Sequence, residues 1–154
     1  MGNRMFQIAR AIQLIDVEIG PIQGSSSYYE TMAWGVTDQE PFINIALVVE
    51  YYGTPTSLLA KTQAIEQQLG RTKTEVWGPR IIDIDILLHD DIVTTSTNLT
   101  IPHSQMANRN FVLFPMAELA PDLIHPVLEK SMQQLLDECT DECYVTVINP
   151  EMAR

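Results

Sequence analysis

The chain has 154 residues, of which 45% are hydrophobic and 19% charged, and this length is typical of one compact domain with its own core. Its formal net charge of −11 excludes nonspecific binding to nucleic acid or to anionic lipid, because Lys and Arg side chains provide that binding. No segment approaches the roughly 18 apolar residues of a membrane span, and no secretion signal opens the chain. We therefore expect one cytoplasmic domain over residues 1–154, without a nucleic-acid or membrane partner.

The first forty residues predict a helix, a short strand and a loop. Apolar residues recur at intervals of three and four from Met5 to Ile15, as they do in a helix with one buried face that begins almost at Met1. The Gly, Pro and Ser residues of 20–27 interrupt this pattern. Residues 28–31 (YYET) predict a short strand, which leads into a loop over residues 31–41.

A buried strand and a second helix are predicted next. The segment 42–51 (FINIALVVEY) is rich in β-branched and apolar residues and contains one polar residue, Asn44. Thr54 provides an N-cap, Pro55 suits the first helical position, and Gly70 suits the end of the helix. The periodicity between them predicts a helix up to Gly70.

A polar loop over residues 71–80 precedes a strongly apolar segment, 81–89 (IIDIDILLH), which predicts a strand. Asp90-Asp91 then predicts a turn, from which residues 92–94 return as a hairpin. Residues 99–101 predict another short extended piece.

The last third of the chain is expected to be mainly helical. Residues 111–119 (FVLFPMAEL) predict a helix, in which Pro115 requires either a place near the first turn or a kink. A final helix is expected from Ser131 through Cys139, followed by a strand over residues 144–148. Cys139 and Cys143 have no partners that would suggest a disulfide framework or a zinc site, so we expect free thiols.

This order of elements predicts an α+β fold. Helix, strand, strand, helix, strand is most of a ferredoxin-like split βαβ sandwich, in which helices cover one face of an antiparallel sheet. The usual first strand of that arrangement is missing from the chain.

The most informative fragment for function is Asp83-Ile84-Asp85. Alternate side chains of a strand share a face, so both carboxylates are expected to project to the same side. Two neighbouring anions repel each other unless a cation offsets them, and paired carboxylates suit Mg²⁺, which usually takes water and substrate phosphates as its other ligands. A D-x-D pattern alone is more often a solvated strand face that carries two acids.

A cluster of basic residues favours the metal over the solvated face. Arg71, Lys73 and Arg80 lie within ten positions of one another and directly precede the two acids, in a chain with only 9 basic residues. A cationic loop beside a metal-holding carboxylate pair is typical of phosphoryl transfer. His103 and Arg109 follow, although a lone His is more often a packed or surface residue.

Three stretches form a more specific pattern: residues 77–88 (WGPRIIDIDILL), 101–103 (IPH) and 108–121 (NRNFVLFPMAELAP). Together they resemble the 6-hydroxymethyl-7,8-dihydropterin pyrophosphokinase family of folate biosynthesis. The resemblance spans nearly the whole chain and includes Gly2-Asn3-Arg4, Asn44 and positions around the second helix.

The resemblance implies an ATP-dependent, Mg²⁺-dependent diphosphokinase. The β,γ-pyrophosphoryl group of ATP would pass as one unit to the hydroxymethyl oxygen of 6-hydroxymethyl-7,8-dihydropterin, leaving AMP and the pterin diphosphate. Asp83 and Asp85 would hold two Mg²⁺ ions that clamp the triphosphate, with ATP as co-substrate. We expect the enzyme to be a monomer with these small molecules as its partners.

The resemblance also assigns roles to individual side chains. Arg71 and Arg80 match catalytic-loop arginines, and Trp77 would close over the site when the loop moves. Phe42 and Phe111 would stack on the pterin ring, which Asn44 and the backbone near Thr31 would recognise, although any single Phe is more often ordinary core. The positions that match ATP contacts are Gln63, Glu66, Lys73, Trp77, His103 and Arg109.

Among the features that depart from the family pattern, one lies in the basic loop and one at the start of the chain. Val76 stands where a basic residue usually precedes the Trp, so one phosphate contact would be absent. Members also begin with a strand that ends in Gly-Ser-Asn-Leu, which is missing ahead of Gly2-Asn3-Arg4, and we expect the true start to lie upstream. Two alternatives therefore stay open: a truncated, non-catalytic pterin or nucleotide-binding module, and a metal-dependent phosphohydrolase that uses the same carboxylates.

Overall fold

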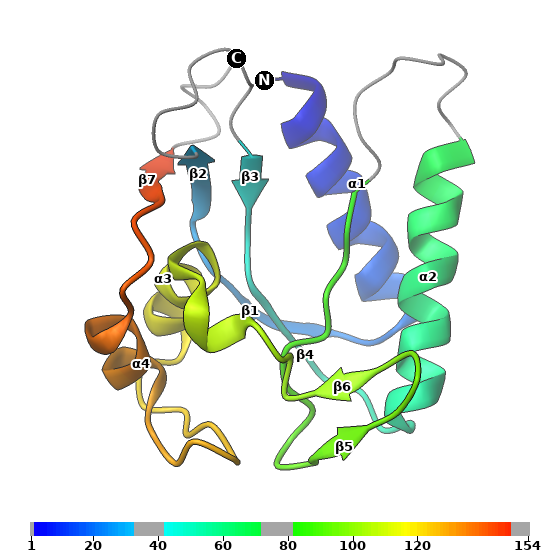
Figure 1. The fold of residues 1–154 in the computed structure, drawn as a ribbon. Coiled ribbons are helices and arrows are strands. Elements are labelled where there is room, and N and C mark those ends of the chain that lie inside the picture. Colours follow the sequence, from blue (N-terminus) through cyan, green and yellow to red (C-terminus); the bar gives the residue numbers. More distant parts are fainter. Residues whose placement is uncertain (1, 33–41, 72–81, 149–154) are drawn as a thin grey trace.

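The computed structural model describes residues 2–32, 42–71 and 82–148, and it has the predicted α+β architecture (Figure 1). Antiparallel strands pair in small sheets, and helices pack on them. In chain order the elements are α1 (Gly2–Glu18), β1 (Ile22–Ser25), β2 (Tyr28–Met32), β3 (Phe42–Asn44), β4 (Leu47–Val49), α2 (Pro55–Arg71), β5 (Thr94–Thr95), β6 (Thr100–Ile101), a 3-10 turn (Met106–Asn108), α3 (Asn110–Leu119), α4 (Met132–Glu138) and β7 (Tyr144–Ile148).

Local features mark the start of α2 and the turn that follows α1. At the start of α2, the Ser57 amide donates to Thr54 Oγ1 at 3.1 Å, which is the predicted N-cap. The helix continues one residue past Gly70, to Arg71. After α1, a Cβ on Gly20 would lie 1.8 Å from the carbonyl oxygen of Glu50, so only glycine allows this close approach of two backbones.

The strand predicted over residues 42–51 is divided into two, β3 and β4. β3 pairs with β2, whereas β4 pairs with β1, both antiparallel. Between them the Ser26 amide donates to the Ala46 carbonyl oxygen at 2.9 Å, and the Ala46 amide donates to Ser26 Oγ at 2.9 Å. These two hydrogen bonds replace the regular strand pairing at the point where the chain passes from β3, paired with β2, to β4, paired with β1. The sequence did not predict β1, because its Gly and Ser residues are typical of turns.

The C-terminal strand is confirmed. β7 pairs antiparallel with β2 from Tyr28 opposite Ile148 to Met32 opposite Tyr144, which gives the sheet order β3-β2-β7. β2 is therefore the central strand of this sheet, and it holds the N-terminal and C-terminal parts of the chain together.

The prediction of a strand over residues 81–89 is wrong for residues 82–89, which join no sheet in the part of the chain that the structure describes. Their backbone finds other partners. The Ile84 amide donates to the Glu66 carboxylate at 2.6 Å, and the Leu87 carbonyl oxygen accepts from the His103 amide at 2.9 Å. The predicted return of residues 92–94 onto this segment is also wrong, because β5 pairs with β6.

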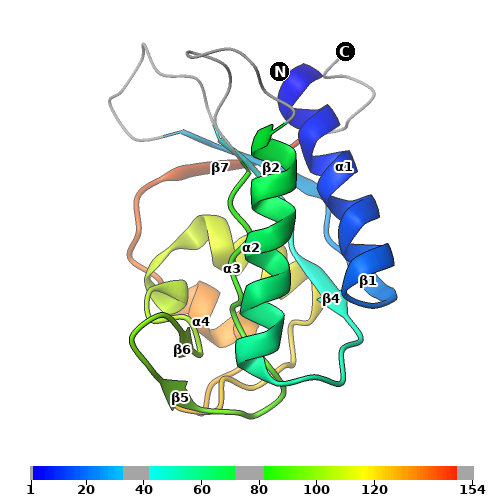
Figure 2. The ribbon, with the colours of Figure 1, turned by 90° about the vertical axis from the view of Figure 1, so that its right-hand side faces the viewer.

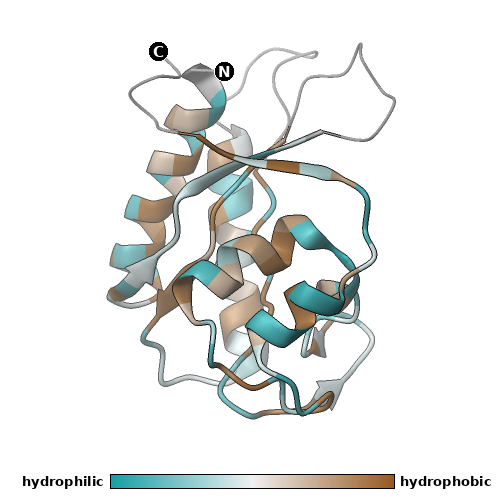
Figure 3. Ribbon diagram, turned by 90° about the vertical axis from the view of Figure 1, so that its left-hand side faces the viewer, coloured by the Kyte–Doolittle hydropathy of each residue, from teal (hydrophilic) through white to brown (hydrophobic). Residues whose placement is uncertain are grey.

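The helices lie on both sides of the strands, not on one face as predicted. Figures 1 and 2 show α1 and α2 side by side, and Figure 3 shows α3 and α4 on the opposite side. Each pair of helices contributes to its own core, and the 82–89 segment contacts both: Ile82 and Ile84 pack against the first, and Leu87 and Leu88 against the second. The first core contains Ala11, Ile15, Ile65 and Leu69, and the second contains Ala46, Met106, Leu113, Met116, Met132 and Leu135.

The C-terminal helices agree with the sequence prediction. Pro115 is buried inside α3. α4 begins with a capping box, in which Ser131 Oγ accepts from the Gln134 amide at 3.1 Å and Gln134 Oε1 accepts from the Ser131 amide at 2.9 Å. Cys139 ends α4, and both cysteines are free. None of the helices that the structure describes has the length and apolar content to cross a bilayer.

Candidate functional site

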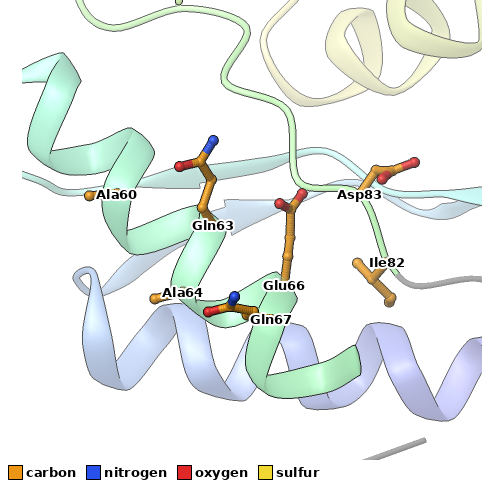
Figure 4. A pocket seen from close by; sticks show the side chains of 7 residues that line it. All are labelled: Ala60, Gln63, Ala64, Glu66, Gln67, Ile82 and Asp83. Atoms are coloured by element: carbon orange, nitrogen blue, oxygen red, sulfur yellow. The ribbon is translucent and has the colours of Figure 1, made fainter. Parts of the chain in front are cut away.

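Two acids of the 82–89 segment face solvent beside helix α2. Asp83 and Asp85 are exposed, whereas Ile82, Ile84 and Ile86 are partly buried, so the predicted alternation occurs without a strand ladder. Asp83 lines an open pocket of about 650 Å³ together with residues of α2 (Figure 4). The lining residues are Ala60, Gln63, Ala64, Glu66, Gln67, Ile82 and Asp83.

Glu66 connects α2 to the acid pair. Its Oε2 accepts the Ile84 amide at 2.6 Å, directly between Asp83 and Asp85. Burial raises the pKa of the Glu66 carboxyl, and the negative charges of the two aspartates raise it further, against the lowering effect of the Ile84 hydrogen bond. Three neighbouring carboxylates therefore repel one another, and a cation placed among them would relieve that repulsion.

Asp85 lines a second, smaller groove of about 320 Å³ with His103 and the β5–β6 hairpin. His103 is half-buried, and its Nδ1 accepts the Gln105 amide at 3.2 Å. In the neutral ring Nε2 then carries the proton and is the available donor. The groove is lined by Leu59, Ile84, Asp85, Ile86, Thr97, Asn98, Leu99, Thr100, His103 and Ser104.

The donor chemistry at this place fits Mg²⁺. Among the described residues, no group of three or more His, Cys, Asp or Glu side chains is arranged to hold a metal ion. Mg²⁺ does not require such a cage, since it is usually bound through one or two carboxylates plus water and substrate phosphates. The exposed carboxylates of Asp83 and Asp85 are suitable protein ligands of this kind.

The residues predicted to recognise the pterin lie on the paired strands β2 and β3. Thr31 is buried and stands opposite Phe42, whose side chain is 54% exposed. Asn44 Nδ2 donates to Thr31 Oγ1 at 3.4 Å. The structure thus brings Thr31, Phe42 and Asn44 together, and the contacts of α3 with β2 and β3 place Phe111 on a neighbouring element.

Arg109 lies beside Phe111. Its guanidinium carbon is 5.7 Å from the centre of the Phe111 ring, and its charge also acts on Asp141. It lines neither of the two grooves beside the acids. Arg71 is the last residue of α2. Lys73, Val76, Trp77 and Arg80 lie outside the described residues.

Sequence reasoning missed several residues that line the two grooves. Ala60 precedes Gln63 by three positions and Gln67 follows it by four, so helical spacing from one predicted contact would have indicated these two residues. Ala64 follows Ala60 by four positions and lines the same pocket. Thr97 and Asn98, at the tip of the hairpin, carried no signal in the sequence, because their position depends on a pairing that the sequence did not predict.

Comparisons with known proteins agree on one family. The model of the 7,8-dihydro-6-hydroxymethylpterin-pyrophosphokinase family matches residues 1–121. The 2-amino-4-hydroxy-6-hydroxymethyldihydropteridine pyrophosphokinase of Aquifex aeolicus is 36% identical over 140 residues, which cover 91% of this chain and 87% of that protein. The protein of the same name from Synechocystis sp. is 40% identical over 142 residues, 91% of this chain and 71% of that protein. The folic acid synthesis protein fol1 of Schizosaccharomyces pombe is 40% identical over 139 residues, 90% of this chain and 19% of that protein.

Proposed function

The chain belongs to the 7,8-dihydro-6-hydroxymethylpterin-pyrophosphokinase family, and we propose that Asp83 and Asp85 are the carboxylates at which it holds Mg²⁺ for this family's reaction. The protein is an ATP-dependent diphosphokinase of folate biosynthesis. It transfers pyrophosphate from ATP to the hydroxymethyl group of 6-hydroxymethyl-7,8-dihydropterin, with AMP and the pterin diphosphate as products. Nothing in the comparisons favours a non-catalytic module.

One observation supports the metal assignment more than any other. Asp83 and Asp85 face solvent, and Glu66 adds a third negative charge beside them. Two bound Mg²⁺ ions would neutralise charge on the triphosphate and on the departing AMP. Asp83 and Asp85 would hold those ions, and phosphate oxygens and water would supply the remaining ligands.

The phosphate-binding side chains surround this acid pair in the proposal. His103 would donate from Nε2 to a phosphate oxygen, because its Nδ1 already accepts the Gln105 amide. Gln63 and Glu66 would contact ATP from the α2 side of the larger pocket. Arg71 and Arg80 would stabilise charge in the transition state, Lys73 and Arg109 would add cationic contacts, and Trp77 would exclude water as the loop closes.

The pterin would lie between the strands and α3. Asn44 would recognise its ring by side-chain hydrogen bonds, with backbone contacts near Thr31. Phe42 and Phe111 would stack on the two faces of the heterocycle, a use that explains why Phe42 is 54% exposed. In solution we expect residues 1–154 to act as one cytoplasmic, monomeric domain that binds no nucleic acid.

Phosphorus NMR of the reaction mixture tests this proposal. With ATP, Mg²⁺ and 6-hydroxymethyl-7,8-dihydropterin, AMP and a pterin diphosphate should accumulate together. Asp85→Asn should lower kcat by at least about 100-fold while leaving the fold intact, whereas the control Asp91→Asn, an exposed acid beyond the grooves, should stay within about twofold of the parent. Orthophosphate release without pterin would instead support a phosphohydrolase, and an Asp85→Asn variant as active as the parent would refute the metal assignment.

A further inference from the structure

Helix α3 begins without a cap of its own. Its N-cap position is Arg109, which has an extended backbone conformation and makes no side-chain capping hydrogen bond. A guanidinium carries only donors and therefore cannot accept from the first amides of a helix. An N-cap is usually Ser, Thr, Asp or Asn, so an Arg at this position leaves the start of α3 to be stabilised by another residue.

Asp141 provides the missing acceptor from 31 residues further along the chain. Its Oδ2 accepts the Asn110 amide at 3.0 Å, and its Oδ1 accepts the Cys143 amide at 3.0 Å. Burial alone would raise the pKa of Asp141, but these hydrogen bonds and the nearby Arg109 charge hold it below its ordinary value. The carboxylate is therefore ionised at neutral pH, as favoured near a helix N-terminus.

The side chain of Asn110 ties the same two segments together a second time. Its Nδ2 donates to the carbonyl oxygen of Asp141 at 3.2 Å and to that of Cys143 at 2.7 Å. Asn110 is 8% exposed, and its Oδ1 has no partner in the part of the chain that the structure describes. The buried amide is thus held by its two donor bonds, which fix residues 141–143 against the start of α3.

Phe111 directly follows Asn110 in α3. The guanidinium of Arg109 covers one face of that ring, and the negative charge of Asp141 attracts the same guanidinium. Asp141 therefore acts on both neighbours of Asn110: it caps the turn that carries Phe111, and it keeps Arg109 over one side of the ring. The opposite face is the one on which the pterin would stack in the proposed function.

We propose that Asp141 is a positioning residue for pterin binding, which caps α3 in place of Arg109 and thereby fixes the ring of Phe111. The inference rests on the proposed role of Phe111 in stacking. Asp141 lies beyond residues 1–121, the part of the chain that the family model matches, so nothing in that match assigns it. It touches no substrate and acts only through α3.

Steady-state kinetics of Asp141→Asn test the proposal. Asn keeps the size of the side chain but removes its charge and one of its acceptors. The loss of a cap of this kind corresponds to a rise of about three- to tenfold in the KM for the pterin, with a smaller rise in the KM for ATP, because Arg109 also contacts ATP in the proposed function, and with kcat within about twofold of the parent. Asp137→Asn is the matched control, since Asp137 is an exposed acid on α4 that accepts from Gln133 Nε2. It should leave all three constants unchanged.

A double-mutant cycle with Phe111→Leu separates this inference from the proposed function. If Asp141 acts through the ring, Asp141→Asn should change the pterin KM by less than about twofold once Phe111 is Leu. An equal rise in both backgrounds, or a fall in kcat with both KM values unchanged, would overturn the positioning role. If Phe111→Leu itself leaves the pterin KM unchanged, the stacking assignment fails independently of Asp141.

Discussion

A single hydroxyl joins strand β2 to helix α3, and its removal should weaken the fold measurably. Tyr29 is 6% exposed, and its hydroxyl donates to Glu118 Oε1 at 2.7 Å. Glu118 also accepts from the Ser27 amide and from Ser27 Oγ. The bond bears on the proposed pterin site, because β2 pairs with the strand that holds Phe42 and Asn44. We therefore choose Tyr29→Phe as the perturbation.

The expected loss follows from the geometry of the bond. A hydrogen bond to a charged acceptor contributes about 1.5–3 kcal/mol. Glu118 is exposed and keeps both Ser27 donors, so its carboxylate remains partnered and the lower part of this range applies. We expect Tyr29→Phe to lower the free energy of unfolding by about 1–2 kcal/mol at pH 7, or Tm by roughly 2–8 °C for a domain of this size.

The same bond predicts a dependence on alkaline pH. Burial, the hydrogen bond to Glu118 and the Glu118 charge raise the pKa of Tyr29 from 10.0 to about 12. A raised pKa gives stability that is fully present below the unfolded value and is lost as pH rises through the folded value, here between pH 10 and 12. Two pKa units correspond to at most about 2.7 kcal/mol, and solvent near Glu118 reduces this figure.

Urea unfolding followed by circular dichroism, at pH 7 and at intervals from pH 9.5 to 11.5, tests both statements. The difference in stability between the parent and Tyr29→Phe should shrink as pH rises, because the parent alone loses the contribution of this hydroxyl. Tyr144→Phe, at a tyrosine that is 60% exposed, is the control and should match the parent throughout. Equal stability of Tyr29→Phe and the parent at pH 7, or a constant difference across the pH range, would refute the reasoning.

Three further predictions concern stability and use the same unfolding assay. Burial lowers the pKa of His125 from 6.5, so the stability that its neutral ring contributes is present above pH 6.5 and is lost as pH falls. His125→Gln should therefore reduce the change in the free energy of unfolding between about pH 5 and 7. An unchanged dependence of that free energy on pH would contradict this. Ile65→Ala removes a side chain that is 0% exposed and should cost about 2–5 kcal/mol, whereas a loss below about 1 kcal/mol would mean that the first core is not tightly packed. Gly20→Ala should cost at least about 1–3 kcal/mol, because the new Cβ would meet the backbone of Glu50, and a neutral effect would contradict that close approach.

The helices and the acid pair could be predicted because their signals are local. The periodicity of α1, the Thr54 cap of α2 and the Ser131 capping box of α4 each depend on residues a few positions apart. The alternation around Asp83 and Asp85 likewise follows from a period of two along the chain. Such patterns are visible before any tertiary contact is known.

The features that sequence reasoning missed depend on distant partners. The division of residues 42–51 results from two hydrogen bonds between Ser26 and Ala46. Residues 82–89 have the composition of a strand, but a strand exists only where another backbone offers a ladder, and here the amide of Ile84 bonds to the side chain of Glu66. The capping of α3 by Asp141 joins residues 31 positions apart. A composition rule cannot identify such pairs.

We propose that Asp83 and Asp85 bind the Mg²⁺ that allows ATP, an anion, to bind to this acidic protein. Calorimetric titration with α,β-methylene-ATP, an analogue that resists cleavage at the reacting bond, measures this directly in Mg²⁺ and in excess chelator. The parent should bind the analogue at least about tenfold more tightly with Mg²⁺ than in chelator. The double variant Asp83→Asn with Asp85→Asn should show no such increase in affinity. Equal affinity of the parent with and without Mg²⁺, or an undiminished gain in the double variant, would contradict the account.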